Sequence, residues 1–586
     1  MAWESLMSIV RGHAARSPQA PAVGILTQSD SAESADWWSY AELDLEARRV
    51  AGMLRRECAP GDRVVLAYPS GLPFAAAFLG SLYAGLVAVP APMPGRYAYQ
   101  QRRLAGIVED AGAAVVATDS TNLPAVRDWA GALAAPAICL ATDTAEVREG
   151  TPIDDPVERP EPDQPAILQY TSGSTGNPKG VVITHGNLLH NGRALIEVFG
   201  FGTDSTMGGW LPLFHDMGLL GMLTPALLAG GRCILAQPVD FLKRPYLWLR
   251  MVDRWDVDFS PAPNFAYQLC ARIVTDKQIA GLDLSRWRYA ANGSEPIHAA
   301  SLEAFAARFA AFGLRPEALT PCYGMAEATV FVTGSPHGRP TVLTVDPDEL
   351  AAHRLRPADQ GRRLVGCGAG PHLAIRIVDP ESRATLPDGE IGEIWMRGAS
   401  VSPGYWGNAA ATAATFGNRT GDEPHHYLRS GDLGVLHEGH LYITGRIKET
   451  LIINGRNLYP TDIEHELRAH HPELGDVGGV FTVPLAGDEH GDEQGLVLTH
   501  EVSGRPSAEH LASIASAMRH TVARDFGVRV AAVALLRRGS TPRTTSGKIQ
   551  RTVLRQMYLD GGLQPLHHTV DSSQQPAQVV TPATAF

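Results

Sequence analysis

Closely spaced cysteines are missing from this sequence. Its 586 residues include six cysteines, and no two of them form a CxxC pair. Zinc sites and the disulfide frameworks of secreted domains both depend on such spacings, so neither kind of site is expected. We therefore predict a cytoplasmic protein with reduced, mostly buried thiols at six scattered positions, Cys58, Cys139, Cys233, Cys270, Cys322 and Cys367.

The sequence also lacks an excess of positive charge and any long apolar run. Lys and Arg number 50 against 62 Asp and Glu, a net charge of −12, which argues against a nucleic-acid surface. The uncharged stretch 74–94 contains Gly80, Gly85 and Pro90, so it predicts a buried helix and strand and no membrane span. No apolar segment follows a charged one at the N-terminus, so no signal peptide is expected.

What the sequence does contain is a regular alternation of helical and extended patterns. A helical pattern at 74–85 leads to the strand pattern LVAVP, and RRLAGIVEDAGAAVVATD repeats the same order. Strands that alternate with helices predict parallel α/β layers. The length predicts two to four domains, and the stretch 151–165, rich in proline and acid, predicts a linker.

The stretch YTSGSTGNPKG, residues 170–180, follows a strand pattern and carries four Ser and Thr hydroxyls, three glycines and one lysine. Backbone donors freed by glycine, with hydroxyls and a cation, suit phosphate oxygens. It is not a Walker A loop, because Pro178 stands where that motif needs Gly-Lys. It is not a nucleophile elbow either, because Ser172 and not Gly stands two residues before Ser174. A flexible surface loop is the alternative that composition leaves open.

The same stretch resembles the phosphate-loop signature of the adenylate-forming superfamily, which includes acyl-CoA ligases, adenylation domains and luciferases. The resemblance implies that ATP phosphates are bound by Thr171, Ser172, Gly173, Ser174, Thr175, Gly176 and Lys179.

Two further motifs are similar to that superfamily. In YGMAEAT, the resemblance makes Glu327 the Mg²⁺ ligand, which suits an ion that takes one or two carboxylates and otherwise phosphate and water. A lone Glu is otherwise usually a solvated side chain. Nucleotide contacts are expected from this motif and from the turn NGSEP, at Gly293, Ser294, Glu295, Tyr323, Gly324, Met325 and Ala326.

The C-terminal third contains two more matching motifs. Asp432 in SGDLG and Arg446 in GRIKE, fourteen residues apart, match the pair that grips the ribose hydroxyls in the family. Lys448 falls at the family's hinge. Lys548 in SGKIQ matches the lysine that reaches the α-phosphate and the substrate carboxylate, although a surface lysine is the default reading of such a residue.

The stretch LPLFHDMGLLG looks specifically like the fatty acyl-AMP ligase branch. We group His215 with Glu327 and Lys548 as catalytic, although a buried His-Asp pair is more often structural. The resemblance places an acyl pocket here, with small or flexible residues leaving room for a chain. The expected lining is Trp210, Asp216, Met217, Gly218, Gly221 and Met222.

The resemblance implies an α/β fold in which a large N-terminal domain of layered α/β subdomains carries a β-barrel-like part. A small, mobile α+β C-terminal domain follows. We expect these domains at 1–446 and 447–563, with a disordered tail rich in Gln, Pro and Thr at 564–586. The polar stretch 341–363, with short helical turns, lies where fatty acyl-AMP ligases carry an insertion. A variable surface loop is the alternative.

The expected function is activation of a medium- or long-chain fatty acid by ATP and Mg²⁺ to an acyl-adenylate, with release of pyrophosphate. The acyl group then passes to a holo acyl carrier protein or to a loading domain of a polyketide or nonribosomal peptide synthetase. Three alternatives stay open: a long-chain acyl-CoA ligase, an amino-acid adenylation enzyme that uses Asp216, and a non-catalytic acyl- or nucleotide-binding protein.

Overall fold

The computed structural model describes residues 4–95, 98–133, 137–154, 160–171, 178–334, 338–453, 456–485, 494–504, 506–544, 547–571, 574 and 576. Within these residues, no helix is both long and apolar enough to cross a membrane.

The first sheet has six strands, β3 (Arg63–Ala67), β4 (Val87–Ala91), β5 (Val115–Thr118), β6 (Ile138–Ala141), β7 (Pro165–Thr171) and β8 (Lys179–Thr184). Their order is β6-β5-β3-β4-β7-β8, and all pairs are parallel except β7 with β8. Alternate residues of β3 face opposite ways: Val64 and Leu66 join one hydrophobic cluster, and Val65 and Ala67 join another. Both faces of this sheet are therefore covered.

The second sheet has eight strands, β1 (Pro21–Leu26), β2 (Ala35–Ser39), β9 (Thr206–Gly209), β10 (Arg232–Leu235), β11 (Phe259–Ala262), β12 (Tyr289–Asn292), β13 (Leu319–Tyr323) and β14 (Thr333–Gly334). The order is β14-β13-β12-β11-β9-β10-β1-β2. The inner strands pair in parallel, and only the two edge strands, β2 and β14, are antiparallel to their neighbours.

Helices form a layer between the two sheets and cover their outer faces. One hydrophobic cluster joins both sheets to α1 (Leu6–Arg16), α2 (Tyr40–Glu57), α3 (Leu72–Tyr83), α7 (His185–Phe199) and α9 (Thr224–Ala229). The first sheet's outer face packs on α4 (Ala98–Ala111) and α5 (Leu123–Ala130). The second sheet's outer face packs on α10 (Pro238–Lys243), α11 (Tyr246–Arg254), α12 (Asn264–Ile273) and α13 (Ala299–Phe309). The short helix α6 (Ala145–Glu149) contacts α2.

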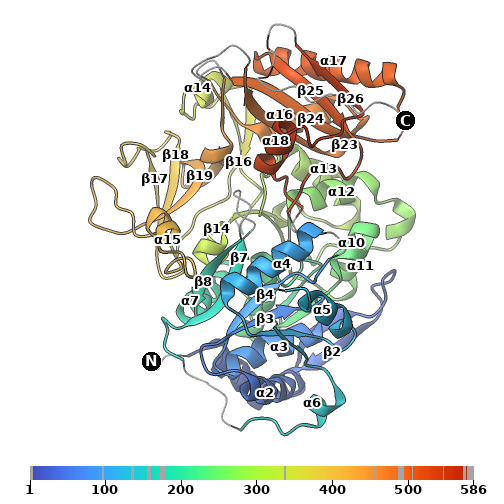
Figure 1. Ribbon diagram of the computed structural model, residues 1–586, viewed down its shortest axis with the longest axis vertical. Helices are drawn as coiled ribbons and strands as arrows, with labels where there is room; N and C mark the ends of the chain where they lie inside the picture. Colours follow the sequence, from blue (N-terminus) through green and yellow to red (C-terminus); the bar gives the residue numbers. More distant parts are fainter. Residues whose placement is uncertain are drawn as a thin grey trace.

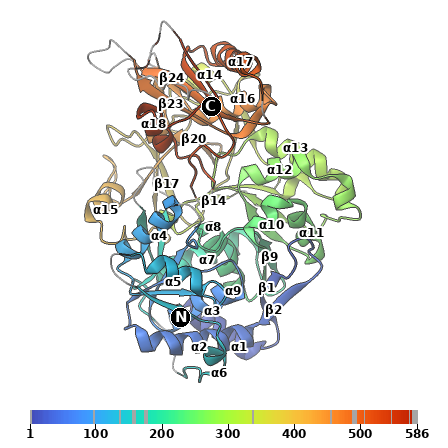
Figure 2. The ribbon, with the colours of Figure 1, turned by 45° about the vertical axis from the view of Figure 1, so that its right-hand side comes forward.

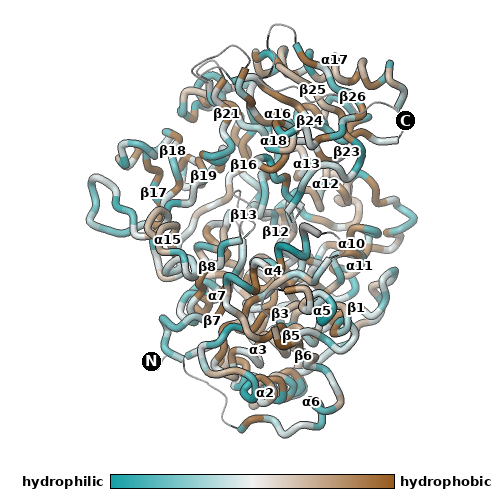
Figure 3. The backbone as a smooth tube through the Cα atoms, in the orientation of Figure 1, coloured by the Kyte–Doolittle hydropathy of each residue, from teal (hydrophilic) through white to brown (hydrophobic). Residues whose placement is uncertain are grey.

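The apolar residues of these layers lie inside the lower part of the molecule, where Figure 3 shows β3 and α3 in brown. The predicted α/β layering is confirmed.

An antiparallel region follows the two sheets. Strands β17 (Ala374–Val378), β18 (Gly392–Arg397), β19 (Leu428–His437) and β20 (His440–Arg446) pair in sequence order. The stretch 341–363 contributes β15 (Val342–Val345), α14 (Pro347–Ala351) and the start of β16 (Arg362–Val365), and a bridge between Gly366 and Tyr442 ties this ribbon to β20. The helix α15 (Ala409–Thr415) contacts β19. This antiparallel region stands where the resemblance implies a β-barrel-like part.

The C-terminal elements form a smaller unit with its own sheet. Its members are β21 (Leu451–Ile453), β22 (Arg456–Leu458), α16 (Pro460–His470), β23 (Leu474–Pro484), β24 (Gln494–Val502), α17 (Ala508–Phe526), β25 (Val530–Leu536), α18 (Arg551–Leu559) and β26 (His567–Val570). The sheet order is β23-β24-β25-β26, and the sheet packs on the three helices through two hydrophobic clusters. Figures 1 and 2 show this unit at the top of the molecule from two directions.

The prediction of a disordered tail from residue 564 is wrong at its beginning. Residues His567–Val570 form β26, which pairs antiparallel with β25. The composition of the tail did not predict this strand because the strand has only four residues, HHTV, and forms by pairing with the edge of an existing sheet. Residues 577–586 lie outside the described residues. The domain boundaries at 446 and 563 stay a prediction.

Candidate active site

One cavity of about 560 Å³ lies between two regions of the chain. We call the two α/β sheets and the antiparallel region the large part, and the C-terminal elements from β21 to β26 the small unit. Most of the predicted site residues line it, although they are far apart in the sequence. They are Thr171, Lys179, His215, Asp216, Met217, Gly221, Gly293, Ser294, Tyr323, Gly324, Met325, Ala326, Glu327, Asp432, Arg446, Lys448 and Lys548.

Strands β7 and β8 bring the two described ends of the phosphate-loop stretch to this cavity. Thr171 and Lys179 stand opposite each other as register partners at its ends. The ammonium of Lys179 lies 5.1 Å from the centre of the Tyr405 ring. The predicted residues Ser172, Gly173, Ser174, Thr175 and Gly176 lie outside the described residues.

A second wall is built by the β19–β20 ladder, in which Asp432 is the register partner of Arg446. The Arg446 Nε donates to Asp432 Oδ1 at 2.7 Å, and the Tyr323 hydroxyl donates to Oδ2 at 2.7 Å. Burial, followed by the Asp432 charge, raises the pKa of Tyr323 well above its usual value, so the phenol stays a donor. These contacts fix a buried carboxylate in the wall of the cavity.

Glu327 comes from a single 3₁₀ turn after β13, at Ala326–Ala328. Its Oε1 accepts a hydrogen bond of 2.8 Å from the Tyr405 hydroxyl. Burial raises the pKa of Glu327, and the Tyr405 hydrogen bond opposes that rise. Tyr405 itself was not predicted, because its stretch VSPGYWGN gives no sign that it would meet a residue 78 positions earlier.

Lys548 is the small unit's contribution to the charge of this cavity. It precedes α18, and its backbone N–H donates to the Thr544 hydroxyl at 3.0 Å. Burial and the nearby Arg446 lower the pKa of Lys548. Three carboxylates, Asp216, Glu295 and Asp432, act in the opposite direction and favour the charged form. The lysine therefore sits among acids that all belong to the large part.

His215 and Asp216 begin the one-turn helix α8 (Asp216–Gly218), and a π-helical turn at Leu219–Leu223 follows. The His215 Nδ1 lies 2.7 Å from Asp216 Oδ1. Burial raises the pKa of Asp216, but His215, Lys548 and the Met217 N–H together outweigh it, so the net pKa is lowered. Asp216 is thus an ionised carboxylate whose charge already has partners.

The far end of the cavity is apolar. The lining there includes Leu195 and Phe199 of α7, Phe259 of β11, and Val330 and Phe331. The rings of Phe199 and Phe331 lie 5.7 Å apart. The cavity therefore joins a charged end to an end with the chemistry of an alkyl chain.

Of the predicted residues that the structure describes, four do not line the cavity. Trp210 stacks on Phe241 at 3.9 Å within the core of the second sheet, and the Met222 sulfur packs beneath Gly209. Gly218 is needed for packing, because a Cβ there would lie 2.4 Å from the Pro212 carbonyl oxygen. These three residues support the wall from behind, and sequence periodicity could not tell the two faces of such an apolar stretch apart.

The fourth residue, Glu295, accepts a hydrogen bond of 2.6 Å from the Phe265 N–H. Burial raises its pKa, and Lys548 opposes that rise. Its neighbour Ser294 lines the cavity with a φ of 70°. This left-handed conformation is uncommon for a residue other than glycine, so the turn NGSEP is shaped by its surroundings.

Polar contacts join the small unit to the large part, and we call this set of contacts the seam. The Arg362 Nη2 lies 2.9 Å from Asp462 Oδ1, and Asn457 Nδ2 lies 2.7 Å from His353 Nε2 and 3.2 Å from the Ala351 carbonyl. Three of these residues belong to the stretch 341–363, namely Ala351, His353 and Arg362. This stretch therefore docks on the small unit.

The seam also contains two stacked histidines. The rings of His298 and His465 lie 4.0 Å apart with 10° between their planes. Burial first, then Arg468, lowers the pKa of His465 to about 4, and burial, His465 and Arg468 lower that of His298 well below 6.5. These lowered pKa values favour the neutral form of both rings.

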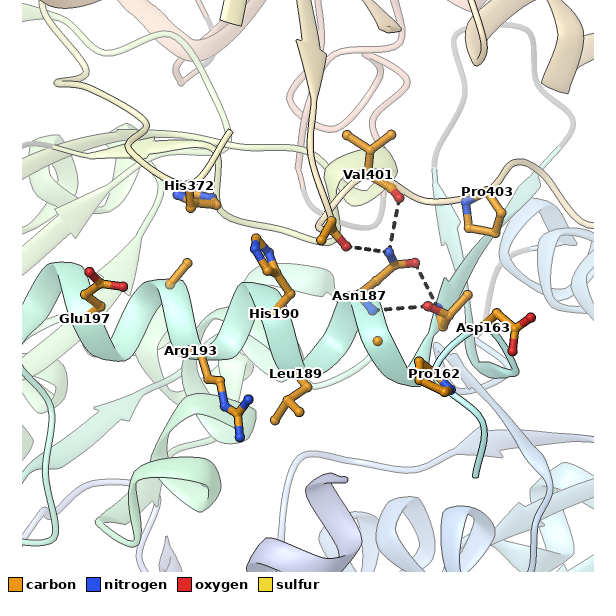
Figure 4. A pocket seen from close by; sticks show the side chains of 14 residues that line it. Pro162, Asp163, Asn187, Leu189, His190, Arg193, Glu197, His372, Val401 and Pro403 are labelled. Atoms are coloured by element: carbon orange, nitrogen blue, oxygen red, sulfur yellow. Dashed lines mark hydrogen bonds between the residues drawn. The ribbon is translucent and has the colours of Figure 1, made fainter. Parts of the chain in front are cut away.

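A second cavity, of about 630 Å³, lies on another face of α7 (Figure 4). Asn187 is held there by two hydrogen bonds from its side-chain amide, to the carbonyls of Ala399 at 2.8 Å and Val401 at 3.1 Å. His190 Nδ1 lies 2.8 Å from the Ser400 hydroxyl. None of the predicted site residues lines this cavity. Its polar side chains fasten α7 to the antiparallel region.

Residues 10–406 match the family model described as AMP-binding enzyme. The chain belongs to this family.

Its relatives share nearly the whole chain. The medium-chain fatty acid–acyl-carrier-protein ligase JamA of Moorena producens is 38% identical, with 90% of each chain covered. The long-chain-fatty-acid–AMP ligase FadD26 of Mycobacterium marinum is 35% identical, covering 97% of this chain and 99% of the relative. The predicted resemblance of this AMP-binding enzyme to the fatty acyl-AMP ligases is confirmed.

A solved structure of a fatty acyl-adenylate ligase is also similar to this chain. The fatty acyl-adenylate ligase of Legionella pneumophila, determined with acyl adenylate and pyrophosphate, is 33% identical. It superimposes with a TM-score of 0.72 over 97% of this chain and 98% of that chain. The predicted α/β architecture is therefore that of the adenylate-forming enzymes.

Proposed function

We propose that this protein activates a medium- or long-chain fatty acid with ATP, forming an acyl-adenylate and releasing pyrophosphate. One observation carries the proposal: a single cavity joins Lys548, Glu327 and the Asp432–Arg446 pair at a charged end to the apolar end around Phe199. The activities named for JamA, FadD26 and the Legionella enzyme support the same reaction.

The reaction brings two anions together. A carboxylate oxygen of the fatty acid attacks the α-phosphorus, and the bond to the bridging oxygen breaks as pyrophosphate leaves. Positioning and charge neutralisation supply most of the catalysis for such a step. Lys548 would bind the carboxylate beside the α-phosphate, while Asp432 would accept hydrogen bonds from the ribose hydroxyls. Lys179 would bind phosphate oxygens at the end of the β7–β8 hairpin.

Magnesium fits Glu327, one of the carboxylates that line the cavity. Mg²⁺ keeps several waters and takes one or two carboxylates together with substrate phosphates, so Glu327, oriented by Tyr405, is a sufficient protein ligand. Bound there, the ion would neutralise phosphate charge. Among the described residues, the group of three metal-binding side chains is Glu466, His470 and Asp525, none of which lines the cavity.

We further propose that a carrier protein, and not free CoA, receives the acyl group, and that the stretch 341–363 is responsible. Transfer in this superfamily is expected to need a swing of the small unit about Lys448. The contacts of Arg362 with Asp462 and of Asn457 with His353 oppose such a swing. A bias of about 1–3 kcal/mol shifts a two-state equilibrium roughly five- to 150-fold. The acceptor would be the phosphopantetheine arm of a holo carrier protein or of a synthase loading domain.

The competing functions are less well supported by the cavity. An amino-acid substrate would need a free carboxylate for its ammonium, and Asp216 already has His215 and Lys548 as partners. A non-catalytic binding protein would not need Lys548 among three acids. An acyl-CoA ligase shares the first step and differs only in the acceptor.

The test is a product assay with ATP, Mg²⁺ and a panel of fatty acids and amino acids. ATP–pyrophosphate exchange that depends on a medium- or long-chain fatty acid is the expected result. Exchange driven by amino acids alone would refute the proposal. Addition of CoA or a holo carrier then decides the acceptor, and we expect acyl-AMP to persist with CoA and to be discharged by the carrier.

A further inference from the structure

A side of the cavity outside the predicted site carries a charged residue, Arg103. It lines the cavity together with Ile107, four residues later on α4, so both lie on one face of that helix. On the same helix, Leu104 and Val108 join Ile107 in the hydrophobic cluster on the outer face of the first sheet. The helix therefore anchors on the core and presents Arg103 toward the cavity.

Nothing in the described part of the chain compensates the charge of Arg103. Its Nε is buried without a hydrogen-bond partner, and the salt bridges among these residues do not include it. Burial alone lowers its pKa, with no carboxylate acting against it. A half-buried cation whose Nε has no partner is unfavourable for the fold, so its presence in a cavity points to an anionic ligand.

The same side of the cavity contains a second cation. A Cβ on Gly106 of α4 would lie 3.6 Å from Pro178, the residue directly before Lys179. The Tyr170 hydroxyl donates to Asp110 of α4 at 2.6 Å, so the helix runs beside both strands of the β7–β8 hairpin. Lys179 faces the ring of Tyr405 and makes no salt bridge with another described residue. Two cations without acidic partners thus flank the hairpin end.

We propose that Arg103 is a further substrate-binding residue, which holds phosphate oxygens of the leaving pyrophosphate. The assignment rests on the proposed adenylation reaction. The planar guanidinium fork matches two phosphate oxygens, which an ammonium cannot do. When the bond to the bridging oxygen breaks, its electron pair stays on the pyrophosphate, and Arg103 and Lys179 would stabilise that added charge. The fatty acid carboxylate, by contrast, must meet Lys548, which comes from the small unit.

The test measures pyrophosphate binding and turnover in the full-length enzyme. For Arg103→Gln, we expect the KM for pyrophosphate in the reverse reaction, from acyl-AMP to ATP, to rise about 10- to 100-fold, the range for losing a charged hydrogen bond. Calorimetry with magnesium pyrophosphate should show the same weakening without any turnover. The KM for the fatty acid should stay unchanged, and Arg103→Lys should recover part of the loss. Arg102→Gln, an exposed position on the same helix, is the matched control.

A stability measurement separates this role from a packing role. Arg103→Met keeps the length of the side chain and removes an uncompensated charge, so its thermal midpoint should equal or exceed that of the wild type. A lowered midpoint with pyrophosphate binding intact would overturn the proposal. A raised KM for a holo carrier alone would also overturn it, because the phosphate would then be that of the phosphopantetheine arm. A wild type that forms no acyl-AMP but binds pyrophosphate through Arg103 would refute the proposed function and leave this assignment standing.

Discussion

The large part and the small unit contribute to the cavity in different ways. In the large part, the charged groups are fixed by the fold itself: Asp432 pairs with Arg446 in a ladder and accepts a hydrogen bond from Tyr323. The small unit contributes Lys548, whose ammonium makes no salt bridge within the described residues and whose place depends on the seam. The large part therefore supplies most of the charged groups that line the cavity, and the small unit adds Lys548.

The largest effect on adenylation is expected from removing the charge of Lys548, which the small unit contributes to the cavity. Lys548→Ala should slow acyl-AMP formation about 10²–10³-fold, or roughly 3–4 kcal/mol, the scale of losing one charge-stabilising donor. ATP binding should change far less, because Asp432 and Lys179 remain. Single-turnover kinetics and ATP titration measure the two effects. Arg538→Ala, exposed in the same unit, is the control, and near-normal turnover of Lys548→Ala would make Lys548 an ordinary surface lysine.

The large part is tested next by removing one hydroxyl. Tyr405→Phe keeps the ring beside Lys179 but deletes the donor to Glu327, which should cost about 10- to 100-fold in adenylation. Because burial already raises the pKa of Glu327, loss of this hydrogen bond should raise it further. Activity should therefore fall at a higher pH on the acid side, and the Mg²⁺ requirement should rise. Tyr442→Phe, buried away from the cavity, should change neither.

The seam is tested by releasing the small unit. Arg362→Ala loses the contact with Asp462 and the approach of its guanidinium, 4.9 Å, to the Tyr459 ring. We expect acyl-CoA formation to rise about fivefold or more, the lower end of a domain-coupling effect, while acyl-AMP formation falls slightly. Arg363→Ala is the matched control, because Arg363 pairs with Glu303 of the large part. Equal CoA use by both variants and the wild type would show that the stretch 341–363 does not restrict transfer to CoA.

Acidification should loosen the seam through its histidines, with a smaller effect. The pKa of His465 is lowered from 6.5 to about 4, so its contribution to docking is present above pH 6.5 and is lost as pH falls toward 4. Asp462 acts in the opposite sense. Its pKa is raised to about 6, first by burial, so its contribution is present below pH 3.8 and is lost as pH rises through about 6.

The pH dependences of His465 and Asp462 partly cancel. We therefore expect proteolysis between the large part and the small unit to increase only about two- to threefold from pH 7 to pH 5.5. His465→Gln removes the titrating ring, so it should flatten this dependence. A slope that is the same in His465→Gln and the wild type would exclude the histidine stack as its cause.

Sequence motifs predicted four charged residues of the candidate site. Glu327, Asp432, Arg446 and Lys548 each stand in a short motif, and the structure brings all four to one cavity. Trp210 and Met222 were misplaced because an apolar stretch does not reveal which side chains face a cavity and which face the core. Tyr405 and Arg103 were missed for another reason. Their roles depend on contacts across the chain, and neither carries a local pattern that predicts them.

The most direct test locks the two regions together in the arrangement described. His298→Cys with His465→Cys places one thiol on each side of the seam, where the rings lie 4.0 Å apart. The wild type, treated with the same oxidant, controls for Cys322, which lines the cavity. If the docked small unit completes the adenylating site, the oxidised double variant keeps acyl-AMP formation and loses transfer to the acceptor until it is reduced. Loss of acyl-AMP formation on oxidation, restored by reduction, would contradict the account.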